Sequence, residues 1–289
     1  MNTVDTVVDS ERWISLQAKV HEARLCEAFR EFRAEGIEPI IIKGWASMRL
    51  YPPEHRRLVG DIDLAVPSLD HSKAAQFCRR PEIAKLNIDL HKEFRYLDAV
   101  PWSAAFARSQ LVDLQGERIR VLSEEDHLRV LCTHWLVDGG AYREKLWDIY
   151  YAVARRKSDF DWPTCLDSVK PHRRRWVITA IAIANRYLGL DIDDLPFVDE
   201  IESVPKWIYR SIESEWARDI PLEPILAAAH DRALLADQIV RRMPPNPIRA
   251  TIECEGELFS DRRSWYQLKV IAKRLGPFIA DTWTYLRRP

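Results

Sequence analysis

Two aspartates separated by a single residue, Asp61 and Asp63, have the types and spacing that suit metal chemistry. They lie in the segment GDIDLAV, residues 60–66, where charged and apolar residues alternate until Pro67, and this period of two predicts a β-strand. Residues two apart on a strand project from the same face, so we expect the two carboxylates to converge. A hard divalent cation such as Mg²⁺ relieves their repulsion and leaves coordination positions for phosphate oxygens. The spacing therefore indicates metal-assisted phosphoryl or nucleotidyl transfer.

The same pattern also arises by chance, because the chain contains 44 acidic residues. A second copy, formed by Asp191 and Asp193, follows Gly189 between two predicted helices and has no strand around it. We interpret that copy as solvated charge. The first copy needs support from the elements around it.

The elements that must position the first pair alternate between helix and strand. Apolar residues recur every three or four positions over residues 11–35, which predicts an amphipathic helix ending near Gly36. The segment IEPIIIK, residues 37–43, predicts a strand that runs into Gly44. The remaining predicted elements of this part are a short helix at 45–50, strands at 60–66 and 86–96, a helix at 70–80, and a hairpin at 111–122 that turns at Gln115-Gly116.

The pattern changes near residue 120. Ser123-Glu124-Glu125-Asp126 resembles a capping box at the start of a helix. Later segments with helical periodicity are residues 146–154, 175–188, 205–217, 225–242 and 265–286. We therefore predict an α+β fold, with a small mixed sheet in residues 1–120 and an all-helical domain, which binds an acceptor or a partner, in residues 121–289.

Composition narrows the class of protein. The balance of 47% hydrophobic and 30% charged residues is that of an ordinary globular protein. Five scattered cysteines without a C-x-x-C pair indicate neither a disulfide framework nor a zinc site. We expect no secretory signal, no membrane span and a cytoplasmic location. A net charge of −1 disfavours DNA or a long RNA as the partner.

Three segments in order, IIKGWASMRLY, RRLVGDIDLAVP and NIDLHKEF, resemble the bacterial nucleotidyltransferase family with a polymerase-β-like minimal core. The later segments LSEEDHLRVLCTHW and LWDIYYAVARR are similar to the helical segment of that family. The resemblance extends over about residues 36–155. It implies a Mg²⁺-dependent enzyme, with Mn²⁺ as a substitute, that takes a nucleoside triphosphate, with ATP expected.

The resemblance also implies roles for individual residues. Asp61, Asp63 and Asp89 would be the catalytic carboxylates that hold the metal, and Asp89 would also activate the acceptor hydroxyl as a base. Lys43 and Gly44 would approach the nucleotide phosphates, where a glycine permits close backbone contact.

Three further residues are assigned to nucleotide binding: Arg57, Gly60 and His91. Arg57 suits a phosphate clamp, although a solvated loop arginine fits the sequence equally well. His91 lies two residues after Asp89, and we expect it to contact phosphate, orient a carboxylate or pack as a buried polar residue.

Some features depart from the family pattern or have no clear role. Better-known members of the superfamily carry Gly-Ser after the first strand, whereas this chain has Gly44-Trp45, and Ser47 is the nearest hydroxyl. This departure weakens the prediction of catalysis more than that of the fold. His134 and Asp148 lie in the downstream segments, where we favour a structural role for both.

Three functions are compatible with the sequence. The leading one is transfer of a nucleoside monophosphate to a hydroxyl of an acceptor, with a small molecule or peptide favoured over a protein or tRNA. The second is a catalytically silent binding module that acts through its helical domain. The third is a sugar-nucleotide glycosyltransferase, which the small size of the predicted sheet disfavours.

Overall fold

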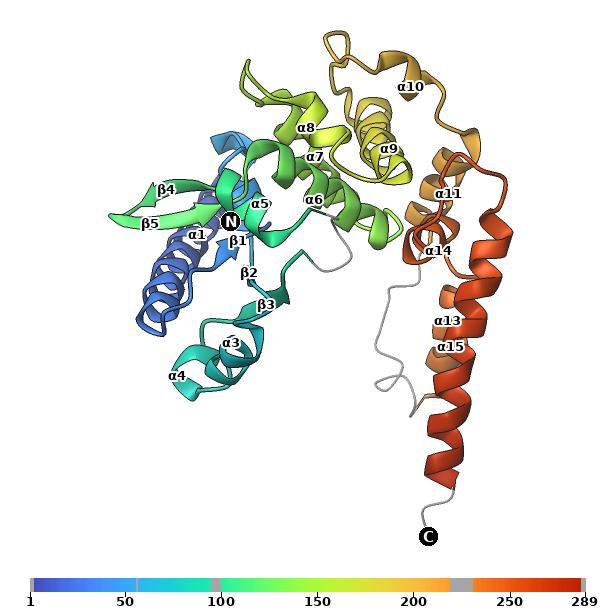
Figure 1. The fold of residues 1–289 in the computed structure, drawn as a ribbon, viewed down its shortest axis with the longest axis horizontal. Helices are drawn as coiled ribbons and strands as arrows, with labels where there is room; N and C mark the ends of the chain where they lie inside the picture. Colours follow the sequence, from blue (N-terminus) through green and yellow to red (C-terminus); the bar gives the residue numbers. More distant parts are fainter. Residues whose placement is uncertain (1–2, 56, 95–99, 219–230, 287–289) are drawn as a thin grey trace. The chain divides into compact units, whose positions relative to one another are not determined.

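The computed structural model describes residues 3–55, 57–94, 100–218 and 231–286 (Figure 1). The chain divides into two compact units. The first comprises Met1–Leu131 and Asp148–Val169, and the second comprises Cys132–Trp147 and Lys170–Pro289. The predicted boundary near residue 120 stays a prediction.

The first unit contains a five-stranded mixed sheet in the order β3-β2-β1-β5-β4. Its strands are β1 (Ile40–Ile41), β2 (Ile62–Val66), β3 (Ile88–Lys92), β4 (Gln110–Leu114) and β5 (Glu117–Val121). β2 is parallel to β3 and β1 is parallel to β5, whereas the pairs β1–β2 and β4–β5 are antiparallel. The predicted α+β class, with a small mixed sheet and many helices, is confirmed.

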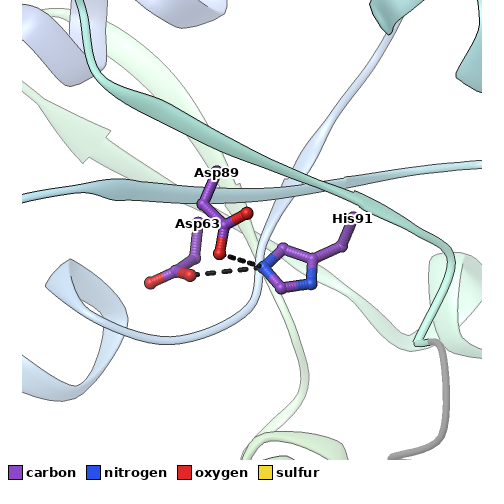
Figure 2. A group of neighbouring side chains, drawn as sticks. All are labelled: Asp63, Asp89 and His91. Carbon is purple, nitrogen blue, oxygen red and sulfur yellow. Dashed lines mark hydrogen bonds and ion pairs between the residues drawn. The ribbon is translucent and has the colours of Figure 1, made fainter. Parts of the chain in front are cut away.

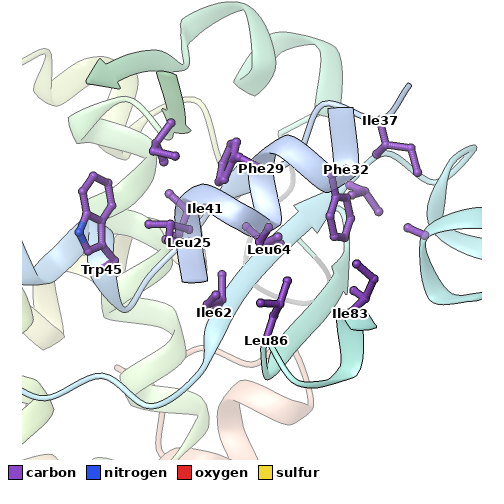
Figure 3. Packing of buried hydrophobic residues seen from close by; sticks show 14 of the residues in the cluster. Leu25, Phe29, Phe32, Ile37, Ile41, Trp45, Ile62, Leu64, Ile83 and Leu86 are labelled. Carbon is purple, nitrogen blue, oxygen red and sulfur yellow. The ribbon is translucent and has the colours of Figure 1, made fainter. Parts of the chain in front are cut away.

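Helix α1 (Thr3–Ala34) packs its apolar face against this sheet. Leu25, Phe29 and Phe32 recur at helical spacing and are fully buried against Ile62 and Leu64 of β2, as Figure 3 shows. The short helices α3 (His71–Phe77) and α4 (Pro81–Ala84) add Phe77 and Ile83 to the same core. All five residues of β2 are buried, because the strand lies inside the sheet and has helices packed on it. Asp63 is one of these five residues, so its carboxylate lies in the interior.

Most predicted elements exist, with shifted ends. The predicted strand 37–43 is reduced to two residues, because Pro39 has no N–H to donate and Gly44 turns the chain away. Helix α2 (Trp45–Met48) and the 3₁₀ turn η1 (Pro53–His55) follow this turn. The hairpin turns at Gln115 and Gly116, and both have positive φ, the requirement of the tightest hairpin turn. Helix α5 (Trp102–Arg108) was not predicted.

Beyond the sheet, the regular secondary structure of the described part of the chain is helical. α6 (Glu124–Val137) begins where the hydroxyl of Ser123 accepts a hydrogen bond from the backbone N–H of Asp126, so the predicted N-terminal cap is confirmed. The other helices are η2 (Arg143–Lys145), α7 (Leu146–Ala154), α8 (Trp162–Leu166), α9 (Pro171–Leu188), α10 (Val198–Glu202), α11 (Lys206–Trp216), α13 (Arg232–Arg242), α14 (Pro247–Glu253) and α15 (Arg263–Leu286). Part of the predicted helix at 225–242 lies outside the described residues.

The second unit is held together partly by tryptophans whose indole N–H groups are satisfied. Trp176 donates to the carbonyl of Gly256 at 3.0 Å, and Trp216 donates to that of Gly140 at 2.8 Å. Such pairing lets a large ring be buried without an unsatisfied donor. No helix among the described residues combines the length and the apolar character that crossing a membrane requires.

Candidate active site

The candidate site lies at one end of the inner strands of the sheet, where β1 ends and β2 begins. Because these strands are antiparallel, the turn at Lys43-Gly44 lies beside the start of β2. The N–H of Ile42 donates to the carbonyl of Asp63 at 3.1 Å, which extends the pairing by one residue and fixes Lys43 next to Asp63. The sheet topology thus brings together residues about twenty apart in the sequence.

Asp63 and Asp89 are directly opposite each other in the register of the parallel strands β2 and β3. Nε2 of His91 lies 3.3 Å from Oδ1 of Asp63 and 3.1 Å from Oδ2 of Asp89, so one ring nitrogen contacts both carboxylates (Figure 2). Nζ of Lys43 lies 2.7 Å from the same Oδ1 of Asp63. The structure therefore brings together four of the sequence-predicted site residues.

The two carboxylates differ in environment. Asp63 is 3% exposed and Asp89 is 53% exposed as side chains. Burial by itself would raise the pKa of Asp63, but the hydrogen bond with His91 and the charge of Lys43 outweigh it and hold that pKa below its usual value. Asp63 is thus a buried carboxylate that stays ionised, and Asp89 is its accessible neighbour.

Asp63, Asp89 and His91 form a group that could hold a metal ion. One potential ligand atom from each lies within 4.8 Å of the others, and no other such group occurs among the residues that the structure describes. Asp61 precedes β2, is exposed and lies outside this group. The potential ligand atoms of this group are two oxygens and one nitrogen, and the metal-ligand set of Asp61, Asp63 and Asp89 stays a prediction.

Gly44 provides the close approach of the backbone to this group. Its φ of 63° and ψ of −108° define a conformation that essentially only glycine adopts. A Cβ atom built there would lie 3.1 Å from Cγ1 of Val59 and 3.4 Å from Oδ2 of Asp63. A side chain at this position would therefore fill the space next to the buried carboxylate.

The chain matches a protein-family model, and the description of that family agrees with this geometry. The model described as uncharacterised nucleotidyltransferase matches residues 5–81 and 79–189, which together are more than half of the chain. The chain belongs to this nucleotidyltransferase family. No match was found among curated proteins or among solved structures.

Membership in the nucleotidyltransferase family confirms the family suggested by the sequence segments and supports a general nucleotidyltransferase function. Family members of this kind generally use a divalent metal and a nucleoside triphosphate, and the Asp63–Asp89–His91 group is compatible with metal binding. The matched range ends at residue 189, so most of the second unit lies outside it.

Ser47 is not placed to replace the hydroxyl of the Gly-Ser pair found in better-known nucleotidyltransferases. It is fully buried, and its Oγ lies 3.4 Å from Nε2 of His127, which is also buried. Burial, and to a smaller extent the charge of Arg49, lowers the pKa of His127 to about 3, so the imidazole is neutral. Ser47 and His127 are therefore part of the buried interior of the first unit.

Arg57, the predicted phosphate clamp, is engaged with Asp148. Its Nη1 contacts Oδ2 of Asp148, while the hydroxyl of Tyr51 donates to Oδ1 of Asp148 at 2.7 Å. Asp148 is buried, and its ion pair with Arg57 offsets the desolvation cost of the buried carboxylate. This triad joins three segments that carry the family resemblance, and Tyr51 is a member that the sequence reasoning missed.

The remaining predicted residues have weaker links to the group. Gly60 has no atom within 4 Å of a built Cβ, so no steric contact requires a glycine there. Nδ1 of His134 lies 3.9 Å from Oδ2 of Asp138, the residue that follows the end of α6. His21 on α1 was also missed, although it is buried and interacts electrostatically with Asp61 and Asp63. Its position inside a long amphipathic helix gave no sequence signal.

Proposed function

We propose that this chain is a metal-dependent nucleotidyltransferase that moves a nucleoside monophosphate from a triphosphate to a hydroxyl of an acceptor. The observation that carries the proposal is the register of Asp63 against Asp89, with His91 between them and Lys43 beside them. Two carboxylates on adjacent strands at a glycine turn match what metal-assisted phosphate chemistry needs.

Asp63 and Asp89 would hold Mg²⁺ or Mn²⁺, with Asp61 at the rim as a third carboxylate. The low pKa of Asp63 supports this assignment, because a metal ligand must be ionised. When bound, the cation would neutralise phosphate charge and polarise the oxygens of the triphosphate. His91 orients both carboxylates, since its Nε2 contacts one oxygen of each.

Lys43 and Gly44 would receive the triphosphate. The side chain of Lys43 is 17% exposed, and its ammonium, which contacts Asp63 on one side, has three N–H donors. Because Gly44 has no side chain, a phosphate oxygen could approach its backbone closely. Arg57 would act indirectly, because its ion pair with Asp148 fixes the segment that follows this turn.

Asp89 is the candidate base, because its carboxylate is exposed and contacts the buried Asp63 only through His91. In the proposed reaction the acceptor oxygen loses its proton to Asp89 and forms a bond to the α-phosphorus. The bond from that phosphorus to the α–β bridging oxygen breaks, and pyrophosphate leaves. An acceptor of small-molecule or peptide size is favoured over nucleic acid, given a net charge of −1.

The proposal is tested by calorimetric titration of each of the four nucleoside triphosphates with and without Mg²⁺. The native chain is compared with the double variant Asp61→Asn, Asp63→Asn. We expect one triphosphate, with ATP favoured, to bind only with Mg²⁺ and only to the native chain. Binding of none of the four would instead support a silent binding module, an alternative favoured by Trp45 in place of serine and by the buried Ser47.

A further inference from the structure

A cavity of about 400 Å³ lies between the middle of α1 and the loop before Asp61. Its lining includes Trp13, Gln17, His21 and Arg24 of the helix and Leu58 and Gly60 of the loop. A volume of this size is within the usual range of small-molecule sites, roughly 300–1,000 Å³. All of its residues belong to the first unit.

His21 gives an independent sign that something binds in this cavity. The side chain is 4% exposed, and its buried Nε2 has no hydrogen-bond partner in the described part of the chain. A buried polar atom without a partner in the protein is rare in native structures. Because this atom has almost no accessible surface, a ligand supplies the missing hydrogen bond only when the imidazole turns toward the cavity. Burial lowers the pKa of His21, so the ring is neutral and offers one donor and one acceptor.

The cavity lies next to the turn at Gly44 and to Asp61, beside the candidate metal group. Gly60 immediately precedes Asp61, and Cγ1 of Val59, another lining residue, lies 3.1 Å from the position of a Cβ on Gly44. Both Asp61 and Asp63 contribute to the electrostatic environment of His21. A molecule whose phosphates lie at Gly44 can therefore extend into the cavity.

The lining suits a flat, uncharged heterocycle. Trp13, Leu16, Val20 and Leu58 line the cavity and are among the most exposed large apolar residues of the described chain, with Trp13 58% exposed. Trp13, Gln17 and His21 are four residues apart in turn and share one face of α1. An aromatic ring for stacking is thus followed by an amide and an imidazole, each with a donor and an acceptor.

A neighbouring cavity of about 360 Å³ has the opposite character. Three cations, Lys19, Arg49 and Arg57, and one carboxylate, Glu22, are among its lining residues. That composition suits an anionic group, whereas the cavity at His21 has Arg24 as its cation. The distribution of charge therefore assigns the uncharged part of a nucleotide to the cavity at His21.

We propose that this cavity binds the nucleobase of the triphosphate, with Trp13 stacked on the ring and with Gln17 and His21 hydrogen-bonded to its edge. This inference rests on the function proposed above. It assigns to α1 a part in substrate selection, in addition to its part in the core.

The test compares ATP with inorganic tripolyphosphate, which has no base, by calorimetry with Mg²⁺ present. The variants are Trp13→Ala and His21→Phe, and the control is Trp265→Ala, which removes a similarly exposed tryptophan from the second unit. We expect each cavity variant to weaken ATP binding about 10-fold, the usual size of one base-stacking or base-edge contact. Binding of tripolyphosphate should not change in any of the variants.

The outcomes separate the two proposals. Equal affinity of the native chain for ATP and tripolyphosphate, or unchanged ATP affinity in both cavity variants, would overturn the base site and leave the metal and phosphate site intact. Failure of the native chain to bind either ATP or tripolyphosphate with Mg²⁺ would contradict the proposed function and the base site with it. Because Trp13 is exposed, its variant should keep the native melting temperature and give a readable result.

Discussion

Asp63 lies directly opposite Asp89 across the parallel pair β2–β3 and shares with it a contact to the same nitrogen of His91. His91 contacts both carboxylates, and potential ligand atoms of the three side chains lie within 4.8 Å of one another, so substitutions at these positions should not have additive effects. Asp63 is buried and Asp89 is exposed. Asp63 is therefore suited to hold a charge away from solvent, and Asp89 is suited to contact a substrate. This difference decides what each substitution should change.

Asp63→Asn should abolish metal-dependent turnover. The substitution removes the buried negative charge, and the loss of several kcal/mol of metal-derived stabilisation corresponds to a rate lower by about 10³-fold. It also leaves the ammonium of Lys43 without its partner, so we expect the free energy of unfolding to fall by about 1–3 kcal/mol. Turnover assays and urea unfolding measure the two effects.

The control is Asp191→Asn, which alters the exposed second D-x-D pair. It should leave turnover unchanged and alter the free energy of unfolding by no more than about 0.5 kcal/mol. Native turnover in Asp63→Asn would exclude Asp63 as a metal ligand.

His91→Gln should weaken metal binding rather than remove it. The histidine orients two carboxylates, and loss of such a supporting residue lowers metal affinity by about 10–100-fold. The Mg²⁺ concentration that gives half-maximal turnover should rise by that factor, while turnover at saturating Mg²⁺ recovers in large part. A fall in turnover that saturating Mg²⁺ does not relieve would indicate a different role.

Gly44→Ala should lose triphosphate binding and stability together. Its positive φ strains any other residue by about 1–3 kcal/mol, and the new methyl group would lie close to Val59 and Asp63. Gly36→Ala is the matched control, because Gly36 also has a positive φ but no atom within 4 Å of a built Cβ. Both variants should be destabilised, as measured by urea unfolding. Equal triphosphate affinity in the two variants would remove Gly44 from the site.

Arg57 and Asp148 should be energetically coupled. Removing either charge leaves the other partly buried and unpaired, so Arg57→Gln and Asp148→Asn should each cost about 2–4 kcal/mol of stability. The double variant should lose less than the sum of the two, with a coupling energy of about 1–3 kcal/mol in a double-mutant cycle. An additive double variant, together with weakened triphosphate binding in Arg57→Gln alone, would restore the phosphate-clamp role.

The decrease in the free energy of unfolding at acid pH should depend on Glu38. Burial alone would raise its pKa, but hydrogen bonds from Arg33 at 2.7 Å and Arg120 at 3.1 Å hold the pKa below its ordinary value of 4.5. A depressed folded pKa stabilises the protein above 4.5, and this stabilisation is lost as the pH falls through the folded pKa. Glu38→Gln should cost about 1–2 kcal/mol at neutral pH and nothing at strongly acidic pH. Urea unfolding over a pH series measures this, and a pH-independent cost would exclude the mechanism.

Local patterns in the sequence were sufficient for most elements of the sheet and its connections. Alternation around Asp61 and Asp63 predicted β2, the pair Gln115-Gly116 predicted the hairpin turn, and Ser123 predicted a helix start. Each of these signals depends on backbone conformation over a few residues, which neighbouring side chains decide. The predicted strand at 37–43 was too long, because Pro39 has no N–H to donate and Gly44 turns the chain away.

The sequence by itself determined the family, the α+β class and the candidates Asp63 and Asp89, because the residue types and their order along the chain carry that information. Tertiary structure alone decided which of the candidates meet: strand register placed Asp89 and His91 at Asp63, left Asp61 at the rim and turned Ser47 into the core. It also decided that Arg57 pairs with Asp148, and that the helix carrying His21 lies beside the loop before Asp61. These relationships join residues far apart in the sequence, and only chain packing determines the distances between them.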